Sequence, residues 1–298
     1  LTSIEEDAGL IVAVAGPGVS ALSMIRPTLE LVQAGPESSD KRVGPSPGPF
    51  GDFMSRVFTS QKQRCVIVGA GGHGRVVLDI LLRSRSVDVL GFLDSNPTLH
   101  GRRMDGLPVL GSLGDLPELA RKEQIAGAIV AIGDNGIRRG FAEQIEQMGL
   151  GLINAIHPSA NLAHNVTVGR NVVIAAGVLV SAHCQIGDSV ILNTGCIVDH
   201  ESMIGTAVHV CPGARLAGRV AVESGAFIGI GATVIQNLRL GYESVVGAGA
   251  VVIQDVEPMT TVVGVPARVA HHTPDQEEFA DMLTPPSLRR TAMTDPVR

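Results

Sequence analysis

The sequence is poor in aromatic residues: tryptophan is absent, and one tyrosine and seven phenylalanines make up 3% of its 298 residues. A chain of this length is long enough for two ordinary domains, but this composition excludes cores built mainly on large rings. Small residues are abundant instead, and 36 of them are glycine. The interior is therefore predicted to be narrow and lined by small aliphatic side chains.

Basic runs and metal-type cysteine spacings are also lacking. The net charge is −6 with no cluster of lysine or arginine, which argues against a nucleic-acid partner. The four cysteines, at 65, 184, 196 and 211, form no metal-binding pattern. Buried free thiols behave as small hydrophobic groups, and this usage favours a reducing, cytoplasmic location.

No uninterrupted apolar run predicts a membrane span. Residues 8–25 carry no charge, but a Gly-Pro-Gly sequence breaks their middle, and acidic residues precede them where a signal peptide is basic. We therefore predict no membrane insertion. Residues 1–63 are interpreted as an uncertain or disordered extension with a linker at 34–51, and residues 269–298 as a disordered tail.

A repeat of six residues runs through the second half of the chain. Every sixth position from 162 to 252 is aliphatic, and a fixed period of this kind indicates a repeat architecture. A second, smaller inward position lies two residues earlier, because side chains of an extended segment alternate between faces. The sixteen aliphatic positions are Leu162, Val168, Ile174, Val180, Ile186, Leu192, Val198, Ile204, Val210, Leu216, Val222, Ile228, Val234, Leu240, Val246 and Val252.

Each repeat of six residues is predicted to form one flat face and one corner. The residue after the aliphatic is often glycine, as at Gly187 and Gly205, which suits a corner. Three faces close a triangular coil of 18 residues, so residues 156–268 are predicted to form a prism of stacked coils. Known hexapeptide-repeat proteins coil in the left-handed sense, against the usual crossover rule, and the predicted fold is a left-handed parallel β-helix.

Residues 64–155 alternate strands with helices and predict a small parallel-sheet, Rossmann-like α/β domain. Strands are expected at 64–69, 87–94 and 126–135, and helices at 75–84 and 137–147. Gly69, Gly71 and Gly74 satisfy G-x-G-x-x-G between the first strand and helix, and Asp94 follows the second strand.

The glycine turn has a functional and a structural interpretation. Glycines at a helix N-terminus let a phosphate approach backbone N–H groups, and a domain this small fits a nucleotide diphosphate better than NAD. Alternatively, the glycines serve only close packing of strand and helix. His73 offers an imidazole to a phosphate or sugar, or is a solvated turn residue.

Several motifs together resemble the sialic acid O-acetyltransferase family of bacterial sugar acyltransferases. They are GAGGHGRVVLDIL, GFLDSNP, GLPVLGSL, AIGDNGIRR, INAIHPSA, VDHESMIGTAVHVCPGARLAGRV and VVGVPARV. The resemblance covers residues 64–270 and includes N-acetyltransferases that act on nucleotide-linked 4-amino sugars of cell-surface polysaccharide biosynthesis. It implies an acetyltransferase that uses acetyl-CoA as co-substrate.

The resemblance implies roles for individual residues. The catalytic histidine of the family lies in an Asp-His-Glu pattern, which makes His200 the general base and Glu201 the residue that raises its basicity. A histidine nine residues later, His209, contacts the acetyl-CoA side, and Ile230 and Ala248 are assigned to the same cofactor. Substrate-binding roles fall on Gly71, Gly72, His73, Asp94 and Ser95. Ser95 departs from the second acidic residue of some members, which leaves the nucleotide base open.

The repeat supports the assignment of His200 independently. His200 is predicted to lie past a corner, at the start of the next face, where a lone histidine is usually a surface residue. Flanking carboxylates favour a base, because they stabilise the protonated imidazole. Gly218 follows 18 residues later, one coil above at about 4.8 Å. A glycine there leaves room for a thioester and frees an N–H for the developing oxyanion.

Two functions of other classes compete. A metalloenzyme of the γ-carbonic anhydrase kind would bind zinc with three histidines, and His164 and His200 lie 36 residues, or two coils, apart. The third ligand is expected about five residues after His200, where Gly205 stands, so the site fails and no metal is predicted. The other alternative is a non-catalytic nucleotide-sugar-binding or scaffold protein. His157 and His183 are interpreted as structural or surface residues.

The sequence therefore predicts a cytoplasmic, homotrimeric, acetyl-CoA-dependent acyltransferase. Its acceptor is an amine or hydroxyl of a nucleotide-linked or sialic-acid-like sugar, and the sequence leaves both the sugar and N- against O-acetylation open. Direct attack on the thioester is expected, since no cysteine or serine is placed as a covalent nucleophile. His200 and His209 are half a coil apart and face different sides of one prism, so they are expected to serve one cleft from different subunits.

Overall fold

A computed structural model describes residues 62–272, all within one compact unit. The predicted N-terminal extension, the linker at 34–51, the apolar segment 8–25 and the C-terminal tail lie wholly or almost wholly outside these residues. Within them, no helix has both the length and the apolar character that a membrane crossing needs.

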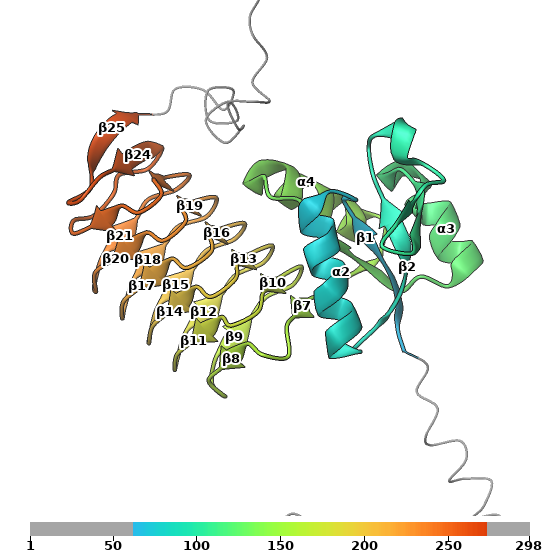
Figure 1. Ribbon diagram of the computed structural model, residues 1–298, viewed down its shortest axis with the longest axis horizontal. Helices are drawn as coiled ribbons and strands as arrows, with labels where there is room; N and C mark the ends of the chain where they lie inside the picture. Colours follow the sequence, from blue (N-terminus) through green and yellow to red (C-terminus); the bar gives the residue numbers. More distant parts are fainter. Residues whose placement is uncertain (1–61, 273–298) are drawn as a thin grey trace, which may run out of the picture. The chain divides into compact units, whose positions relative to one another are not determined.

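The first part of the described chain is an α/β domain with a six-stranded sheet in the order β3-β4-β2-β1-β5-β6 (Figure 1). All neighbours pair in parallel except β3 and β4, which form an antiparallel edge. The strands are β1 (Arg64–Val68), β2 (Asp88–Leu93), β3 (Arg103–Met104), β4 (Leu107–Gly111), β5 (Gly127–Val130) and β6 (Gly151–Leu152), and the helices are α2 (Gly72–Ser84), η1 (Pro97–Leu99), η2 (Leu113–Asp115), α3 (Leu116–Glu123) and α4 (Asn135–Gln147).

Helix α2 begins at Gly72, three residues before the predicted start at 75. The prediction placed the whole glycine run in a turn, but Gly72, His73 and Gly74 form the first helical turn. The apolar residues whose spacing predicted the helix do anchor it, because Val77, Leu78 and Leu81 are buried against the sheet.

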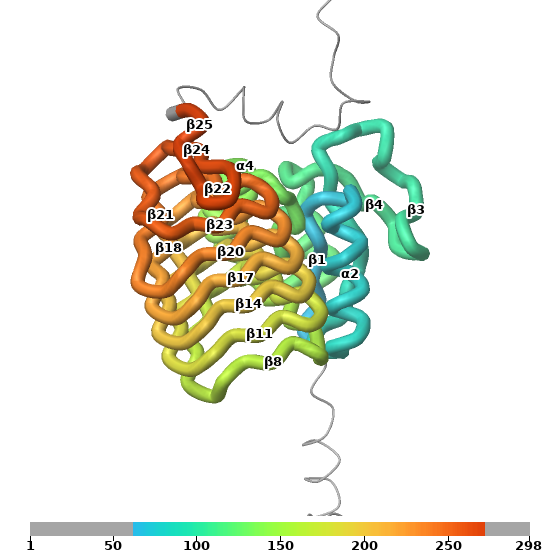
Figure 2. The backbone as a smooth tube through the Cα atoms, turned by 60° about the vertical axis from the view of Figure 1, so that its left-hand side comes forward, coloured from blue at the N-terminus to red at the C-terminus, as the bar shows by residue number. Residues whose placement is uncertain are grey.

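The second part is the predicted prism, seen as stacked coils in Figures 1 and 2. Each of the sixteen predicted aliphatic residues is the second residue of a two-residue strand from β8 to β23, and strands 18 residues apart pair in parallel. The prism begins at β7, one repeat before the first of these aliphatic residues and within one residue of the predicted start at 156. Its strands are β7 (Ala155–Ile156), β8 (Asn161–Leu162), β9 (Thr167–Val168), β10 (Val173–Ile174), β11 (Leu179–Val180), β12 (Gln185–Ile186), β13 (Ile191–Leu192), β14 (Ile197–Val198), β15 (Met203–Ile204), β16 (His209–Val210), β17 (Arg215–Leu216), β18 (Ala221–Val222), β19 (Phe227–Ile228), β20 (Thr233–Val234), β21 (Arg239–Leu240), β22 (Val245–Val246) and β23 (Val251–Val252).

Three parallel sheets form the faces of the prism. One contains β7, β10, β13, β16, β19 and β22, and continues into β24 (Thr260–Val263) and the antiparallel β25 (Arg268–His272). The others run from β8 to β23 and from β9 to β21. Strand β25 extends past residue 269, where the sequence analysis placed the start of the tail.

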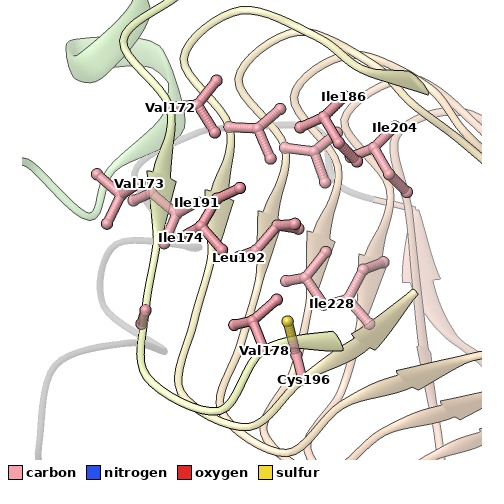
Figure 3. Packing of buried hydrophobic residues seen from close by; sticks show 14 of the residues in the cluster. Val172, Val173, Ile174, Val178, Ile186, Ile191, Leu192, Cys196, Ile204 and Ile228 are labelled. Carbon is pink, nitrogen blue, oxygen red and sulfur yellow. The ribbon is translucent and has the colours of Figure 1, made fainter. Parts of the chain in front are cut away.

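The core of the prism consists of columns of small side chains (Figure 3). Both inward positions of a repeat are buried: Val190 and Leu192 have no exposed surface, and neither has Cys196 of the next repeat. Cys184 also lies on an inward position, and all four cysteines are buried free thiols. The narrow interior predicted from the lack of aromatic residues is therefore present.

The glycine that follows the inward aliphatic does not serve the corner as predicted. A Cβ at Gly187 would lie 2.9 Å from the backbone nitrogen of Thr206 in the next coil, so glycine is required there by close approach. The left-handed backbone of a corner falls two residues later, at Ser189 with a φ of +56°. Corners of the next face use glycine at this position, for example Gly195 with a φ of +65°.

Buried leucines of the prism are expected to carry its stability. Leu192→Ala should lower the free energy of unfolding by about 2–5 kcal/mol, since it leaves a cavity between coils that cannot collapse. The matched control is Leu82→Ala on α2, whose side chain is 60% exposed and which should change it by less than about 1 kcal/mol. Denaturant titrations of both variants test this, and equal losses would contradict the described core.

Candidate active site

The glycine turn joins β1 to α2 and lies at the carboxyl edge of the sheet. Gly69 has a φ of +108°, and a Cβ on Gly74 would lie 2.0 Å from the Gly69 carbonyl oxygen. These two glycines therefore serve the close strand–helix packing of the structural interpretation. Gly71 and Gly72 differ, because a Cβ on either would meet no described atom within 4 Å. Their backbone is open to a ligand.

Asp94 stabilises this turn. Its Oδ2 accepts a hydrogen bond of 2.8 Å from the Ala70 N–H, and its Oδ1 accepts another of 2.8 Å from the Asn96 N–H. The carboxylate thus connects the end of β2 to the glycine turn. Asp94 therefore has a structural role in the turn, which its spacing from the glycines did not predict, in addition to the role expected toward the substrate.

A cavity of about 470 Å³ opens at this edge of the sheet. It brings together all five residues predicted to bind substrate, which are Gly71, Gly72, His73, Asp94 and Ser95. It also has walls that the sequence analysis missed, from the segments that follow β4 and β5 and from α4. The sequence could have predicted these walls, because the carboxyl ends of parallel strands meet at one edge of a sheet. These additional residues include Ser112, Leu113, Gly114, Ala131, Ile132, Gly133 and Phe141.

His73 is not the solvated turn residue of the alternative interpretation. Burial, and then the positive charge of Arg138, lower its pKa to about 4. Its Nε2 atom is buried and has no hydrogen-bond partner in residues 62–272. A neutral, unsatisfied imidazole on the cavity wall is suited to a polar group of a ligand.

His209 points outward from the prism on β16 yet is only 9% exposed. Its ring packs edge-on against Phe227 in the next coil, with 5.3 Å between centroids, and its Nε2 lies 3.2 Å from Nδ2 of Asn193. Burial, followed by the charges of Arg138 and His73, lowers its pKa to about 3. His209 and His73 are therefore neighbours at the contact between prism and α/β domain.

His200 lies in the turn between β14 and β15. It was predicted past the corner, at the start of the next face, and this placement is wrong because the residue is part of the corner itself. The side chain is half exposed, and its Nδ1 lies 3.1 Å from Oε2 of Glu201. The same oxygen is 3.5 Å from Nη1 of Arg219, one coil above Glu201. The Asp199 carboxylate accepts a hydrogen bond of 2.8 Å from the His200 backbone N–H, and this bond is the main cause of its lowered pKa.

Gly218 stacks over His200 as the 18-residue coil predicts. A Cβ on Gly218 would lie 2.5 Å from His200 Nε2, so only glycine admits the imidazole in this orientation. The ring lies directly against Gly218, and the room for a thioester beside this glycine stays a prediction. The Gly218 N–H has no acceptor in the described part of the chain, whereas its neighbours Ala217 and Arg219 donate within the coil stack.

The predicted cofactor residues do not converge within one chain. Gly218 lies at the corner of His200, whereas His209 lies on a face covered by the α/β domain. Ile230 and Ala248 are stacked at a third place, the corner that follows β19 and β22, where Ile230 is 61% exposed. Among residues 62–272, no group of three or more His, Cys, Asp or Glu side chains is arranged to hold a metal ion.

A parallel β-helix with a histidine–carboxylate pair at a corner, next to an α/β domain with a cavity at its glycine turn, defines an acyltransferase of the hexapeptide-repeat class. The family model described as the PglD N-terminal domain matches residues 64–145. The chain belongs to the nucleotide-amino-sugar acetyltransferase family, and it is an acetyltransferase with the predicted two-part fold.

Two solved structures support the assignment to this family. PerB from Caulobacter crescentus, in complex with CoA and GDP-perosamine, is 39% identical with a TM-score of 0.66, and the match covers 70% of this chain and 97% of that one. The acetyltransferase domain of PglB from Neisseria gonorrhoeae, in complex with acetyl coenzyme A, is 33% identical with a TM-score of 0.66, covering 70% and 99%.

A curated relative matches over a shorter stretch. UDP-N-acetylbacillosamine N-acetyltransferase of Bacillus subtilis is 35% identical over 116 residues, which are 37% of this chain and 50% of that protein. The chain therefore matches half the length of this relative.

The two buried histidines predict a loss of stability in acid. Both stay neutral in the folded protein down to about pH 4 and about pH 3, whereas in the unfolded chain they bind protons below about pH 6.5. The unfolded state therefore binds more protons as the pH falls from 6.5 toward 4. The free energy of unfolding should fall by about 1–2 kcal/mol per histidine between pH 7 and pH 5.

Denaturant titrations at several pH values check this. His209→Gln should flatten the pH dependence of the free energy of unfolding, and His164→Gln, at an exposed corner, should leave it unchanged. A wild-type slope equal to that of His209→Gln would mean that the pKa of His209 is the same in the folded and unfolded protein, which contradicts its lowered pKa.

Proposed function

We propose that this protein transfers the acetyl group of acetyl-CoA to the amine of a nucleotide-linked amino sugar. The observation that carries the proposal is the pair of His200 and Glu201, at 3.1 Å, beside a glycine that fixes the ring. An Nδ1–H that donates to the carboxylate leaves Nε2 as the proton acceptor. Amine acetylation is preferred to hydroxyl acetylation because the named relatives are N-acetyltransferases.

The reaction needs no covalent enzyme intermediate. The sugar amine attacks the thioester carbonyl carbon, and His200 Nε2 takes a proton from the nitrogen. The carbon–sulfur bond then breaks, and CoA leaves as the thiol once that proton reaches the sulfur. The Gly218 N–H, which has no acceptor among the described residues, would donate to the oxyanion that develops on the carbonyl oxygen.

The acceptor is assigned to the cavity at the glycine turn. Backbone N–H groups of Gly71, Gly72 and His73 at the start of α2 suit the phosphates of a nucleotide diphosphate, and the unsatisfied Nε2 of His73 suits a polar group of the same ligand. The relative solved with CoA and GDP-perosamine supports this class of acceptor. In this division of labour, residues 64–155 hold the acceptor and residues 156–268 hold acetyl-CoA and the base.

We infer a homotrimer, because one chain separates the parts that must meet. His73 and His209 lie at the domain contact, whereas His200 and Gly218 lie at a corner of the prism and Ile230 at another. Three copies related by cyclic symmetry place the corner of one prism against the face of the next. Acetyl-CoA would then lie between neighbouring prisms, along the exposed side chains of Ile230 and Ala248.

Two further assignments are proposals as well. The four cysteines are buried as free thiols, a state that a reducing cytoplasm maintains. Acetylated amino sugars linked to nucleotides are precursors suited to cell-surface polysaccharide synthesis, where the product is expected to be used.

His200→Ala should lower kcat by about 10²- to 10⁴-fold, the contribution of a positioned general base, while acetyl-CoA still binds. The side chain lies outside the core, so stability should change little. His164→Ala is the matched control, because His164 lies at the same corner two coils below and should keep wild-type kcat. Steady-state thiol release measures both, and His200→Ala with more than about a tenth of wild-type kcat would refute the assignment.

Mixing subunits tests the trimer and the shared site together. His200→Ala and His73→Ala should each be poorly active alone, because one lacks the base and the other an intact acceptor cavity. Co-expressed at equal amounts, they should regain about a quarter of wild-type activity, the share of neighbouring pairs with both residues intact. If mixed oligomers form and regain no activity, both residues act within one subunit.

A further inference from the structure

Arg138, on the first turn of α4, is fully buried. Arginine is almost never buried without compensation, because its guanidinium must leave water. Here every acceptor of the guanidinium is an uncharged oxygen, and no carboxylate in residues 62–272 accepts a hydrogen bond from it. Burial lowers its pKa to about 9, and the nearby charge of Asp134 opposes that shift. This arrangement calls for a role beyond filling space.

One side of the guanidinium binds the prism. Arg138 Nε donates to the Ser189 carbonyl at 2.7 Å, and its Nη2 donates to the Ala207 carbonyl at 2.9 Å. These two residues are 18 apart, at the same left-handed corner position of successive coils. The next residue of this column is Gly225, whose carbonyl accepts from Asn135 Nδ2 at 2.9 Å. The start of α4 is thus bound to three stacked carbonyls.

The other side of the guanidinium binds the cavity wall. Arg138 Nη1 donates to the carbonyls of Ile132 at 2.9 Å and Gly133 at 3.0 Å. Both residues line the cavity at the glycine turn. Nη2 also donates to Asn135 Oδ1 at 2.7 Å, which connects the two side chains that reach the prism. One guanidinium therefore fixes the loop at residues 131–134 to the coils of the prism.

A further bond extends this attachment downward. The Val130 N–H, at the end of β5, donates to Asn171 Oδ1 at 2.7 Å, and Asn171 occupies the same corner column one coil below Ser189. The cavity wall and β5 are therefore held on four consecutive coils. Loops that follow strands are usually the mobile part of such a site, and here the loop has a rigid support.

We propose that Arg138 is a positioning residue that registers the acceptor cavity against the prism. The proposal rests on the function inferred above. Arg138 would act through the loop at 131–134 and through His73 and His209, and it would contact no substrate. Its charge also matters, because no lysine or arginine lines the cavity, so a buried cation behind the wall favours an anionic ligand in it.

Three variants of the full chain test the proposal. Arg138→Met removes every hydrogen bond that the guanidinium donates, and Arg138→Lys keeps the charge but not the fork of donors. Asn135→Ala is milder: it removes the Gly225 bond and one acceptor of Arg138 without touching the helix cap, which is the side chain of Asp134. Arg139→Met is the matched control, since the neighbouring arginine makes no hydrogen bond to any described residue.

Hydrogen exchange of residues 131–134 is the first measurement, and it is independent of activity. Exchange should rise about tenfold or more in Arg138→Met and Asn135→Ala and stay at the wild-type rate in Arg139→Met. Unchanged exchange in the folded variants would overturn the proposal. Should Arg138→Met not fold, Asn135→Ala and Arg138→Lys still carry the test.

Kinetics is the second measurement, with a nucleotide-linked amino sugar and acetyl-CoA as substrates. In Arg138→Lys the acceptor KM should rise about tenfold or more, because misplacing a binding wall is costly, while the KM of acetyl-CoA stays within about twofold. Equal rises for both substrates would overturn positioning of the acceptor. A wild-type enzyme inactive on every such sugar would instead refute the proposed function and leave the exchange result valid.

Discussion

The stacking of residues 18 apart at the spacing of neighbouring strands is the constraint on which the rest of the molecule depends. It aligns the inward aliphatics into columns, and it forces glycine at positions such as Gly187, where the next coil leaves no room for a Cβ. The same register puts Gly218 over His200 and Arg219 over Glu201. The proposed chemistry therefore uses contacts that the coil provides without any special loop.

The corners carry strain that the stack compensates. Non-glycine residues with positive φ recur at corners, and each costs about 1–2 kcal/mol. Glu201 is one of them, with a φ of +59°, and its N–H donates to the Ala182 carbonyl of the coil below at 2.9 Å. That bond holds the backbone, so the carboxylate is presented to His200 in a fixed geometry.

Much of this fold follows from the sequence because one period governs it. Sixteen aliphatic positions predict sixteen strands, and the glycine motif with Asp94 predicts where the cavity lies. What the sequence did not reveal depends on contacts across the domain boundary. The burial of Arg138 is an example, since a charged residue on an amphipathic helix is normally solvent-exposed. The corner position of His200 was missed because a period fixes spacing and does not locate the turn within it.

The central claim is that the base at a prism corner acts on an amine delivered by the glycine-turn cavity. CoA thiol release from acetyl-CoA, measured across a panel of nucleotide-linked 4-amino sugars and free sialic acid, tests this claim most directly. The account predicts saturable release with at least one nucleotide-linked amino sugar, an N-acetylated product, and none with free sialic acid. Release with free sialic acid alone would contradict it, and so would the absence of release with every acceptor of the panel.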